Sequence, residues 1–395
     1  MGLSVTDSAR DPIKLIAAAL AAQLIGGLVT QMSPLIIGGV IPGLSLTEQQ
    51  AGFVAFAEFF VLSGTAIIAA PLLPRLSYRT VCLVAVLLAV AAQLGSLFTT
   101  SLQAVVALRC VAGIGEGLVY AVSLAVVASR SANPDRLYGL FQIAWAVGSM
   151  GFFSVGGQLT EAFAHRGIYG MITVVTVVLI PLLLLLPADH SDVRVQESGE
   201  AESSSAVMGI IVLLGTFLYL TVSAAVYTFS EPLGQRAGLD TGQVGFALTA
   251  GSVVGFTGAL MATWLNVRRG RAMPITVFCV VFSLLAIVIC INQNPVVYVG
   301  ALILTVVFFY FSVPYLFGLA AALDRQGRWA AAAGSAYLLG FAVGPAFAGT
   351  VIETFGYPAL GYASALVTMT AWGLLMVVVN HVQSQQRAPA PASAA

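Results

Sequence analysis

Three charged side chains lie inside otherwise apolar segments and could do chemistry there. They are Glu58 in GFVAFAEFFVLSG, and Arg109 and Glu116 in LRCVAGIGEGLVYA. A charge near the centre of a bilayer costs about 2.5–3.5 kcal/mol on insertion scales, so it is a functional hypothesis by default. A carboxylate can take up and release a proton, whereas an arginine stays charged. The residue types therefore predict glutamate for proton coupling, and arginine for an anionic solute or a carboxylate partner.

The spacing of these residues predicts how they meet. Arg109 and Glu116 are seven residues apart on an expected helix, almost two full turns, so they share one face about 10 Å apart along the axis. Glu58 lies on another expected helix at nearly the depth of Arg109. We expect an Arg109–Glu58 pair, with Glu116 as the first and Glu58 as the second candidate for proton coupling. The alternative is an ion pair that only holds the helices together.

The elements that position these charges are predicted to be membrane-spanning helices. Only 8% of the 395 residues are charged and 59% are hydrophobic, against about 25% charged in soluble domains. Twelve apolar segments are each long enough to cross a hydrocarbon core about 30 Å thick as a helix. A β-barrel would show short alternating strands instead. The expected spans are 13–38, 49–73, 80–99, 101–129, 136–160, 168–187, 207–231, 241–265, 272–291, 296–323, 329–352 and 358–380.

The basic residues predict the orientation of these spans. Of the sixteen, Arg166 and Arg236 lie in loops on one side, and Arg109 lies inside a span. The other thirteen fall in the termini and in the loops of the opposite side. Loops rich in Lys and Arg face the cytoplasm. Both termini are therefore predicted to be cytoplasmic, which requires an even number of spans.

The chain is predicted to divide into two pseudo-symmetric six-helix bundles. Residues 188–206, ADHSDVRVQESGEAESSSA, are acidic and Ser-rich, and form the only long polar segment between expected spans. This composition is typical of a flexible linker. Residues 1–187 would form one bundle and residues 207–395 the other. Matching features at matching positions in the two halves indicate an internal repeat.

Two of these matching features resemble the major facilitator superfamily. Basic loops follow the second and eighth spans, PLLPRLSYRT and TWLNVRRGRAMP, and glycine-rich segments lie in the fifth and eleventh, VGSMGFFSVGGQL and LGFAVGPAFAGTV. The resemblance implies twelve helices that rock about a central site, and cross-half contacts between spans 5 and 8 and between spans 2 and 11. It also implies gating roles for the loop arginines. These are Arg75, Arg79, Arg268 and Arg271.

The fourth span resembles two branches of that superfamily. Its R-x-x-x-G-x-G-E-G arrangement runs from Arg109 through Gly113 and Gly115 to Glu116 and Gly117. It is similar to the organic anion:cation symporters and to the lysolipid-carrying spinster group. The resemblance implies that Glu116 couples to protons and that Arg109 supports the solute or the glutamate. Both branches carry a charged residue in the first span, where this chain has polar, uncharged residues.

Polar and aromatic residues inside the spans are candidates for solute contact. Pro314 can interrupt the tenth span and is flanked by tyrosines, and tyrosines recur on one stripe of the seventh. Besides Arg109, the candidates are Gln23, Gln31, Gln142, Trp145, Tyr219, Tyr227, Tyr310, Tyr315 and Tyr337.

These observations predict a secondary active transporter and exclude other classes. The chain has no P-loop motif, no cluster typical of an enzyme, no metal or cofactor motif and no nucleic-acid motif. We expect a small organic solute, an anion or an amphipathic carboxylate, carried by alternating access with proton coupling. A proton-driven multidrug or lysolipid exporter is the alternative. Uptake or export, and symport or antiport, stay open. The expected setting is a monomer in the plasma membrane, the inner membrane of a bacterium.

Overall fold

The computed structural model describes residues 12–131, 134–188, 206–265, 270–323 and 328–387. These ranges form helices and contain no strand, and twelve of the helices are long and apolar enough to span a membrane. The predicted all-α membrane fold is confirmed. The α-helices are α1 Ile13–Gln31, α2 Ser33–Leu44, α3 Glu48–Ala69, α4 Tyr78–Phe98, α5 Leu102–Arg130, α6 Pro134–Phe163, α7 His165–Leu183, α8 Ala206–Thr228, α9 Ser230–Arg236, α10 Thr241–Leu265, α11 Ala272–Ile291, α12 Pro295–Ala321, α13 Arg328–Phe355 and α14 Tyr357–Arg387.

Two expected spans are each broken near one end into a long and a short helix. The segment predicted at 13–38 ends at Gln31 and continues as α2, and that at 207–231 ends at Thr228 and continues as α9. A proline follows each break, Pro34 in one half and Pro232 in the other. Proline lacks the amide proton that an unbroken helix would donate to the carbonyl four residues earlier. The two breaks meet, because the Ser33 and Thr228 hydroxyl groups are 3.2 Å apart.

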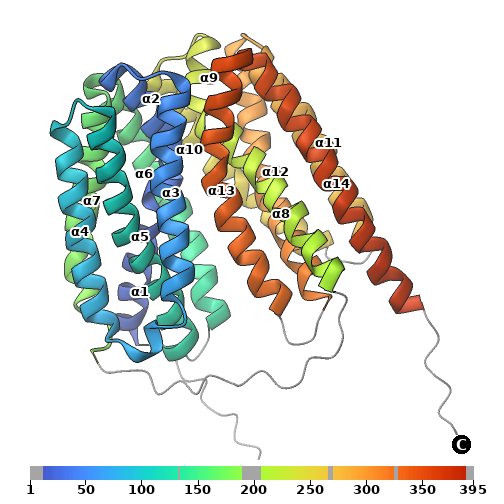
Figure 1. Cartoon of the computed structure of the whole chain (residues 1–395), viewed down its shortest axis with the longest axis horizontal. Helices are drawn as coiled ribbons and strands as arrows, with labels where there is room; N and C mark the ends of the chain where they lie inside the picture. The colour runs from blue at the N-terminus through green and yellow to red at the C-terminus, as the bar shows by residue number, and fades with distance from the viewer. Residues whose placement is uncertain (1–11, 132–133, 189–205, 266–269, 324–327, 388–395) are drawn as a thin grey trace, which may run out of the picture.

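The first half of the chain lies at one side of the molecule and the second half at the other (Figure 1). Helices α1 to α7 form the blue-to-green side, and α8 to α14 form the yellow-to-red side. The start of α1 and the end of α14 lie at the same end, and α2 and α9 lie at the opposite end. The linker predicted at 188–206 falls almost entirely outside the described residues. The division into two bundles therefore stays a prediction.

Two helix pairs bring the halves together, α3 with α13 and α6 with α10, as the family resemblance implied. The first pair approaches so closely that a Cβ atom on Gly52 would lie 2.3 Å from the Pro345 carbonyl oxygen. The Ser154 and Thr249 hydroxyl groups lie 3.1 Å apart in the second pair. Both contacts lie in the parts of these helices nearer α2 and α9. The halves are thus closed at that end.

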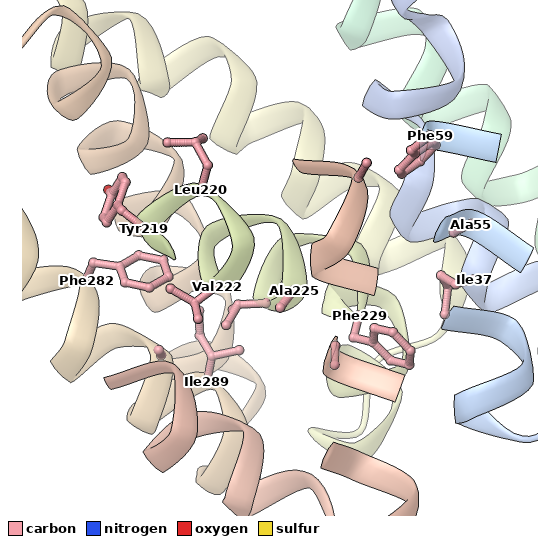
Figure 2. Packing of buried hydrophobic residues seen from close by; sticks show 14 of the residues in the cluster. Ile37, Ala55, Phe59, Tyr219, Leu220, Val222, Ala225, Phe229, Phe282 and Ile289 are labelled. Atoms are coloured by element: carbon pink, nitrogen blue, oxygen red, sulfur yellow. The ribbon is translucent and has the colours of Figure 1, made fainter. Parts of the chain in front are cut away.

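In the described part of the chain, the buried apolar side chains form two clusters, of which only one joins the two halves. One cluster of buried side chains contains residues of both halves and runs through α2, α3 and the C-terminal helices. Figure 2 shows part of it: Ile37 and Phe59 come from the first half, and Tyr219, Phe229 and Phe282 come from the second. A second cluster is built from the first half alone, between Leu15 and Leu186.

Candidate functional site

A cavity of about 430 Å³ lies between the two halves. Its walls come from α1, α3, α5 and α6 on one side, and from α8 and α10 to α13 on the other. On α6 and α13, and on α10 from Ser252 onward, the lining residues lie beyond these contacts between the halves, toward the end where α1 begins. Seven of the predicted solute-contacting residues line this cavity. They are Gln23, Gln31, Gln142, Trp145, Tyr227, Tyr310 and Tyr337.

The two walls differ in chemistry. The first half contributes three glutamines, and the Ser123 hydroxyl donates to the Gln23 carbonyl oxygen at 2.6 Å. The second half contributes aromatic rings, including Tyr337 stacked on Phe341 at 6.3 Å between centroids. The two walls join where the Tyr227 hydroxyl donates to the backbone carbonyl oxygen of Gln31 at 2.7 Å. The amide groups of the lining thus come from the first half and most of its rings from the second, although the first half adds Phe59, Tyr120 and Trp145.

Tyr219 and Tyr315 lie outside this cavity lining. Tyr219 is fully buried, with its ring 5.0 Å from that of Phe278 and 5.5 Å from that of Phe282. Tyr315 is also buried, and its hydroxyl donates to the Ala262 carbonyl oxygen at 3.4 Å. Both tyrosines pack within the second half. The prediction was wrong for them because helical spacing alone does not show which face of a helix its neighbours cover.

The three charges form a second site, buried inside the first half. Arg109 Nη1 donates to Glu58 Oε1 at 2.9 Å, and neither side chain is exposed. The predicted ion pair is present. Arg109 Nη2 also donates to the Ser96 hydroxyl at 2.7 Å and to the Ala92 carbonyl at 3.2 Å, and the guanidinium lies 4.3 Å from the centre of the Tyr169 ring. The arginine is thus held by α3, α4 and α7 around its own helix, α5.

Glu116 lies in the same cluster. Its Oε1 accepts a hydrogen bond from Gln93 Nε2 at 2.9 Å, and its carboxyl group interacts with that of Glu58. The Oε2 atoms of Glu58 and Glu116 are buried and have no donor among the described residues. In this part of the chain Arg109 is therefore paired with Glu58 alone, Glu116 lies beside this pair without a salt bridge, and one oxygen of each carboxyl group has no hydrogen-bond donor.

The glycines around Glu116 admit neighbouring helices rather than solute. A Cβ atom on Gly113 would lie 2.5 Å from the Glu58 carbonyl oxygen, and one on Gly117 would lie 2.4 Å from the Leu62 carbonyl oxygen. The backbone of α3 therefore lies directly against α5. Arg109 was predicted to contact the solute and Glu116 to share its helix face, but neither residue lines the cavity. The packing of α3 on α5 turns both residues into the interior of the first half.

The cluster and the cavity are nevertheless adjacent along α3. Glu58 belongs to the cluster, whereas the next residue, Phe59, lines the cavity together with Leu62 and Ser63. The Ser63 hydroxyl donates to the Leu338 carbonyl oxygen of α13 at 3.2 Å. One helix therefore contacts the charge cluster, the cavity and the second half of the chain.

A further acidic residue, Glu231, is buried at the closed end. It lies on α9, outside the twelve spanning helices, and only 1% of its side chain is exposed. Its Oε1 accepts hydrogen bonds from the Thr241 hydroxyl at 2.6 Å and from Gln235 Nε2 at 2.7 Å. Burial raises the pKa of Glu231, and these two hydrogen bonds offset part of that rise. The carboxyl group abuts Gly38 of α2, so it lies where the two halves meet.

The predicted gating arginines lie at the opposite end. Arg79 Nε donates to the Leu186 carbonyl oxygen at 2.8 Å, which ties the start of α4 to the chain after α7. Arg75 is exposed and Arg271 is half-buried directly before α11. Arg268 lies outside the described residues. The gating role of these residues stays a prediction.

The family of the chain is shown by its sequence as well as by this architecture. Residues 17–324, most of the chain, match the profile of the Major Facilitator Superfamily. The chain belongs to the Major Facilitator Superfamily. It is therefore a membrane transporter rather than an enzyme, and its resemblance to this family is confirmed. Comparison with curated protein sequences finds no match.

Solved structures of this superfamily share the fold. A bacterial homologue of the human lysosomal transporter Spinster, crystallised in an inward-facing and unoccupied conformation, aligns with a TM-score of 0.72 over 96% of this chain and 98% of its own. The human organic anion transporter MFSD10 (TETRAN) aligns with a TM-score of 0.61 over 92% and 98%. Both are 15% identical to this chain, so they establish the fold alone.

Several residues of both sites were missed from the sequence. Gln93 and Ser96 complete the charge cluster, and their signal was two polar residues three apart on one face of an apolar span. Tyr169 carried no such signal, since aromatic residues are common near the ends of spans. Tyr120 and Phe341 of the cavity were missed for a similar reason. Large aromatic side chains pack in the core as often as they line a site.

Proposed function

We propose that the chain is a proton-coupled secondary active transporter that moves a small organic solute by alternating access. The proposal rests on one observation above all: a second buried carboxyl group, that of Glu116, lies beside the Arg109–Glu58 pair without an arginine of its own among the described residues. With both ionised, the cluster would hold an uncompensated negative charge away from water, which is costly. A proton on one of the two removes that charge. Glu116, whose carboxyl group lacks an arginine of its own, is the proposed carrier, with Glu58 as its partner.

The position of the cluster supports coupling to the cavity. Proton loss would leave a second negative charge beside the Arg109–Glu58 pair, and α3 connects that pair to the cavity wall and to α13. A change in the contacts of Arg109 would therefore act on α3, the helix that carries Glu58 and packs against α13 of the other half. Such a two-state element is what allosteric coupling between two sites requires.

The contacts between the halves at the end of α2 and α9 support alternating access, because they close the cavity at one end only. The halves touch at the end that carries α2 and α9, and the cavity lies toward the other end. The orientation predicted from the basic residues makes that other end cytoplasmic. On this proposal the structure represents the state that loads or releases solute on the cytoplasmic side, and opening requires the α3–α13 and α6–α10 contacts to separate.

A proton-driven exporter of hydrophobic molecules is the second candidate. The observation that favours it is the aromatic wall of α10, α12 and α13, which includes Phe256, Phe309 and Phe341. Rings offer contact area with little demand on the shape of the bound molecule. Both candidates use the same cavity and the same charge cluster; the second carries hydrophobic molecules and is an exporter, whereas the direction of the first is open.

Transport by purified protein in proteoliposomes tests the proposal. A solute found in a thermal-shift screen should accumulate against its gradient only while a pH gradient is imposed, and a protonophore should abolish the accumulation. The sign of the effective pH gradient separates symport from antiport. Solute that equilibrates without ever accumulating under either gradient would contradict proton coupling.

A further inference from the structure

The cavity lining is richer in amide groups on the side of the first half and in aromatic rings on the side of the second half, and none of its described residues is charged. From the first half, Gln23, Gln31 and Gln142 reach its surface. From the second half the surface is formed chiefly by rings, among them Phe309, Tyr337 and Phe341. No Asp, Glu, Lys, Arg or His lines it in the part of the chain that the structure describes. The solute therefore meets a divided but uncharged surface.

The charged side chains next to the cavity wall are buried inside the first half and do not reach the cavity surface. Glu58 precedes the lining residue Phe59, but its Oε1 accepts from Arg109, and both side chains are wholly buried. The second terminal nitrogen of Arg109 donates to the Ser96 hydroxyl and the Ala92 carbonyl oxygen. A charged solute in the cavity would therefore lose part of its hydration without gaining an ionic partner, which is unfavourable.

The glutamines instead suit a neutral polar group. The Gln23 side chain already bonds to Ser123 and interacts with Tyr120, but its NH₂ group carries two hydrogens and its oxygen two lone pairs, so it can still bind one more polar group. The side chains of Gln31 and Gln142 also line the cavity, and each amide carries both a donor and an acceptor. Such a wall can bind an amide, a hydroxyl or a carbonyl group directly.

We infer that the solute is an uncharged amphiphile. Its hydrogen-bonding group lies against the glutamines of α1 and α6, and its apolar or aromatic body lies against the rings of α12 and α13. The cavity volume of about 430 Å³ is in the range of pockets that hold drug-sized molecules. This inference rests on the proposed function, since it names the class of solute carried. It replaces the anionic solute expected from Arg109.

Binding of a matched series tests the class. The probes are 6-phenylhexanamide, 6-phenylhexanoate and 6-phenylhexylamine at neutral pH, with the protein in nanodiscs and empty nanodiscs as the control for partitioning into lipid. These molecules share one skeleton and differ in the charge of the head group. The amide should bind about tenfold more tightly than either ion, because only the ions must shed water without a partner. Equal or tighter binding of an ion, or no binding by any of the three, would overturn the inference.

A charge placed in the cavity should remove the advantage of the amide over the oppositely charged probe. Gln142 is exposed, so the variants Gln142→Lys and Gln142→Glu add a charge without burying it. Gln142→Lys should favour the hexanoate and Gln142→Glu the hexylamine, each by about tenfold over the wild type. Gln103→Lys, on the exposed first turn of α5 and outside the cavity lining, is the matched control and should leave the order unchanged. An undiminished advantage of the amide in both Gln142 variants would also overturn the inference.

The outcome separates the solute class from the transport mechanism. Binding in the expected order without any accumulation driven by a pH gradient would refute proton-coupled transport and leave the solute class standing. Accumulation of the hexanoate or the hexylamine, in preference to the amide, would refute the solute class and leave proton coupling standing.

Discussion

The interiors of the two halves are packed with different chemistry. In the first half, α3, α4, α5 and α7 enclose Glu58, Arg109 and Glu116. In the second half, α8 and α11 enclose an aromatic group, Tyr219 with Phe278 and Phe282. Among the described residues of the second half, Glu231 is the only buried charged side chain, and it lies at the end, on α9. On the proposed function, the membrane-spanning helices of the first half carry the coupling proton and those of the second half provide apolar contact.

The two halves nevertheless use the same device to bring two helices together. In the first half, glycines of α5 admit the backbone of α3, as at Gly113 and Gly117. In the second half, glycines of α10 admit α12, where a Cβ atom on Gly258 would lie 1.9 Å from the Val307 carbonyl oxygen. Close approach is therefore a shared property of the fold. The charge cluster is an addition to one half only.

Breaking the ion pair should produce the largest effect on stability. Arg109→Ala strands the Glu58 carboxylate in the interior, and removal of one partner of a buried pair typically costs about 3–5 kcal/mol. The double variant Arg109→Ala with Glu58→Ala should lose less than the sum of the two single variants, because it strands neither partner of the pair. Thermal unfolding of the three variants in nanodiscs measures this difference. Additive losses would show that the pair contributes no coupling energy.

Closing the space between α3 and α5 should have a smaller effect. Gly113→Ala places a methyl group against the Glu58 backbone, and overpacking of this kind costs about 1–3 kcal/mol. Gly373→Ala on α14 is the control, because a Cβ atom there would meet no atom within 4 Å. It should be neutral or should stabilise the helix by up to about 1 kcal/mol. Equal destabilisation by both substitutions would show that the close approach of α3 and α5 is unimportant.

The smallest effect is expected at Glu231 and should depend on pH. Its pKa is raised in the folded chain, so its contribution to stability is fully present below the ordinary value of 4.5 and is lost as pH rises through the raised pKa. Glu231→Gln keeps the hydrogen bonds but cannot ionise. The melting temperature of the wild type should therefore fall, relative to that of Glu231→Gln, as the pH increases above about 4.5. Parallel curves would contradict a buried, titrating Glu231.

The sequence predicted the fold and the ion pair because both follow from regular geometry. Lengths of apolar segments define the spans, and residue counts along straight helices placed Arg109 level with Glu58. The rotation of each helix about its axis was not predictable, because the neighbouring helices determine it. Arg109, Tyr219 and Tyr315 therefore lie away from the cavity in which the sequence analysis placed them.

The helix breaks show a similar limit. Prolines 34 and 232 were visible in the sequence, but each span was expected to continue past its break. A proline permits either a kinked helix or a new one, and only the packing of the surrounding helices decides. Gln93 and Ser96 were missed because their function depends on Arg109 and Glu116 of the neighbouring helix.

The central claim is that Glu116 carries the coupling proton, and the variant Glu116→Gln tests it most directly. Glutamine represents the permanently protonated side chain and retains a hydrogen-bonding partner for Gln93, so the fold should be preserved. Uptake of one solute is measured in proteoliposomes twice, with an imposed pH gradient and as counterflow without one. Accumulation driven by the gradient should disappear in Glu116→Gln, whereas counterflow should persist, because exchange needs one protonation state only. Gradient-driven accumulation by a well-folded Glu116→Gln protein, or loss of counterflow together with accumulation, would contradict the claim.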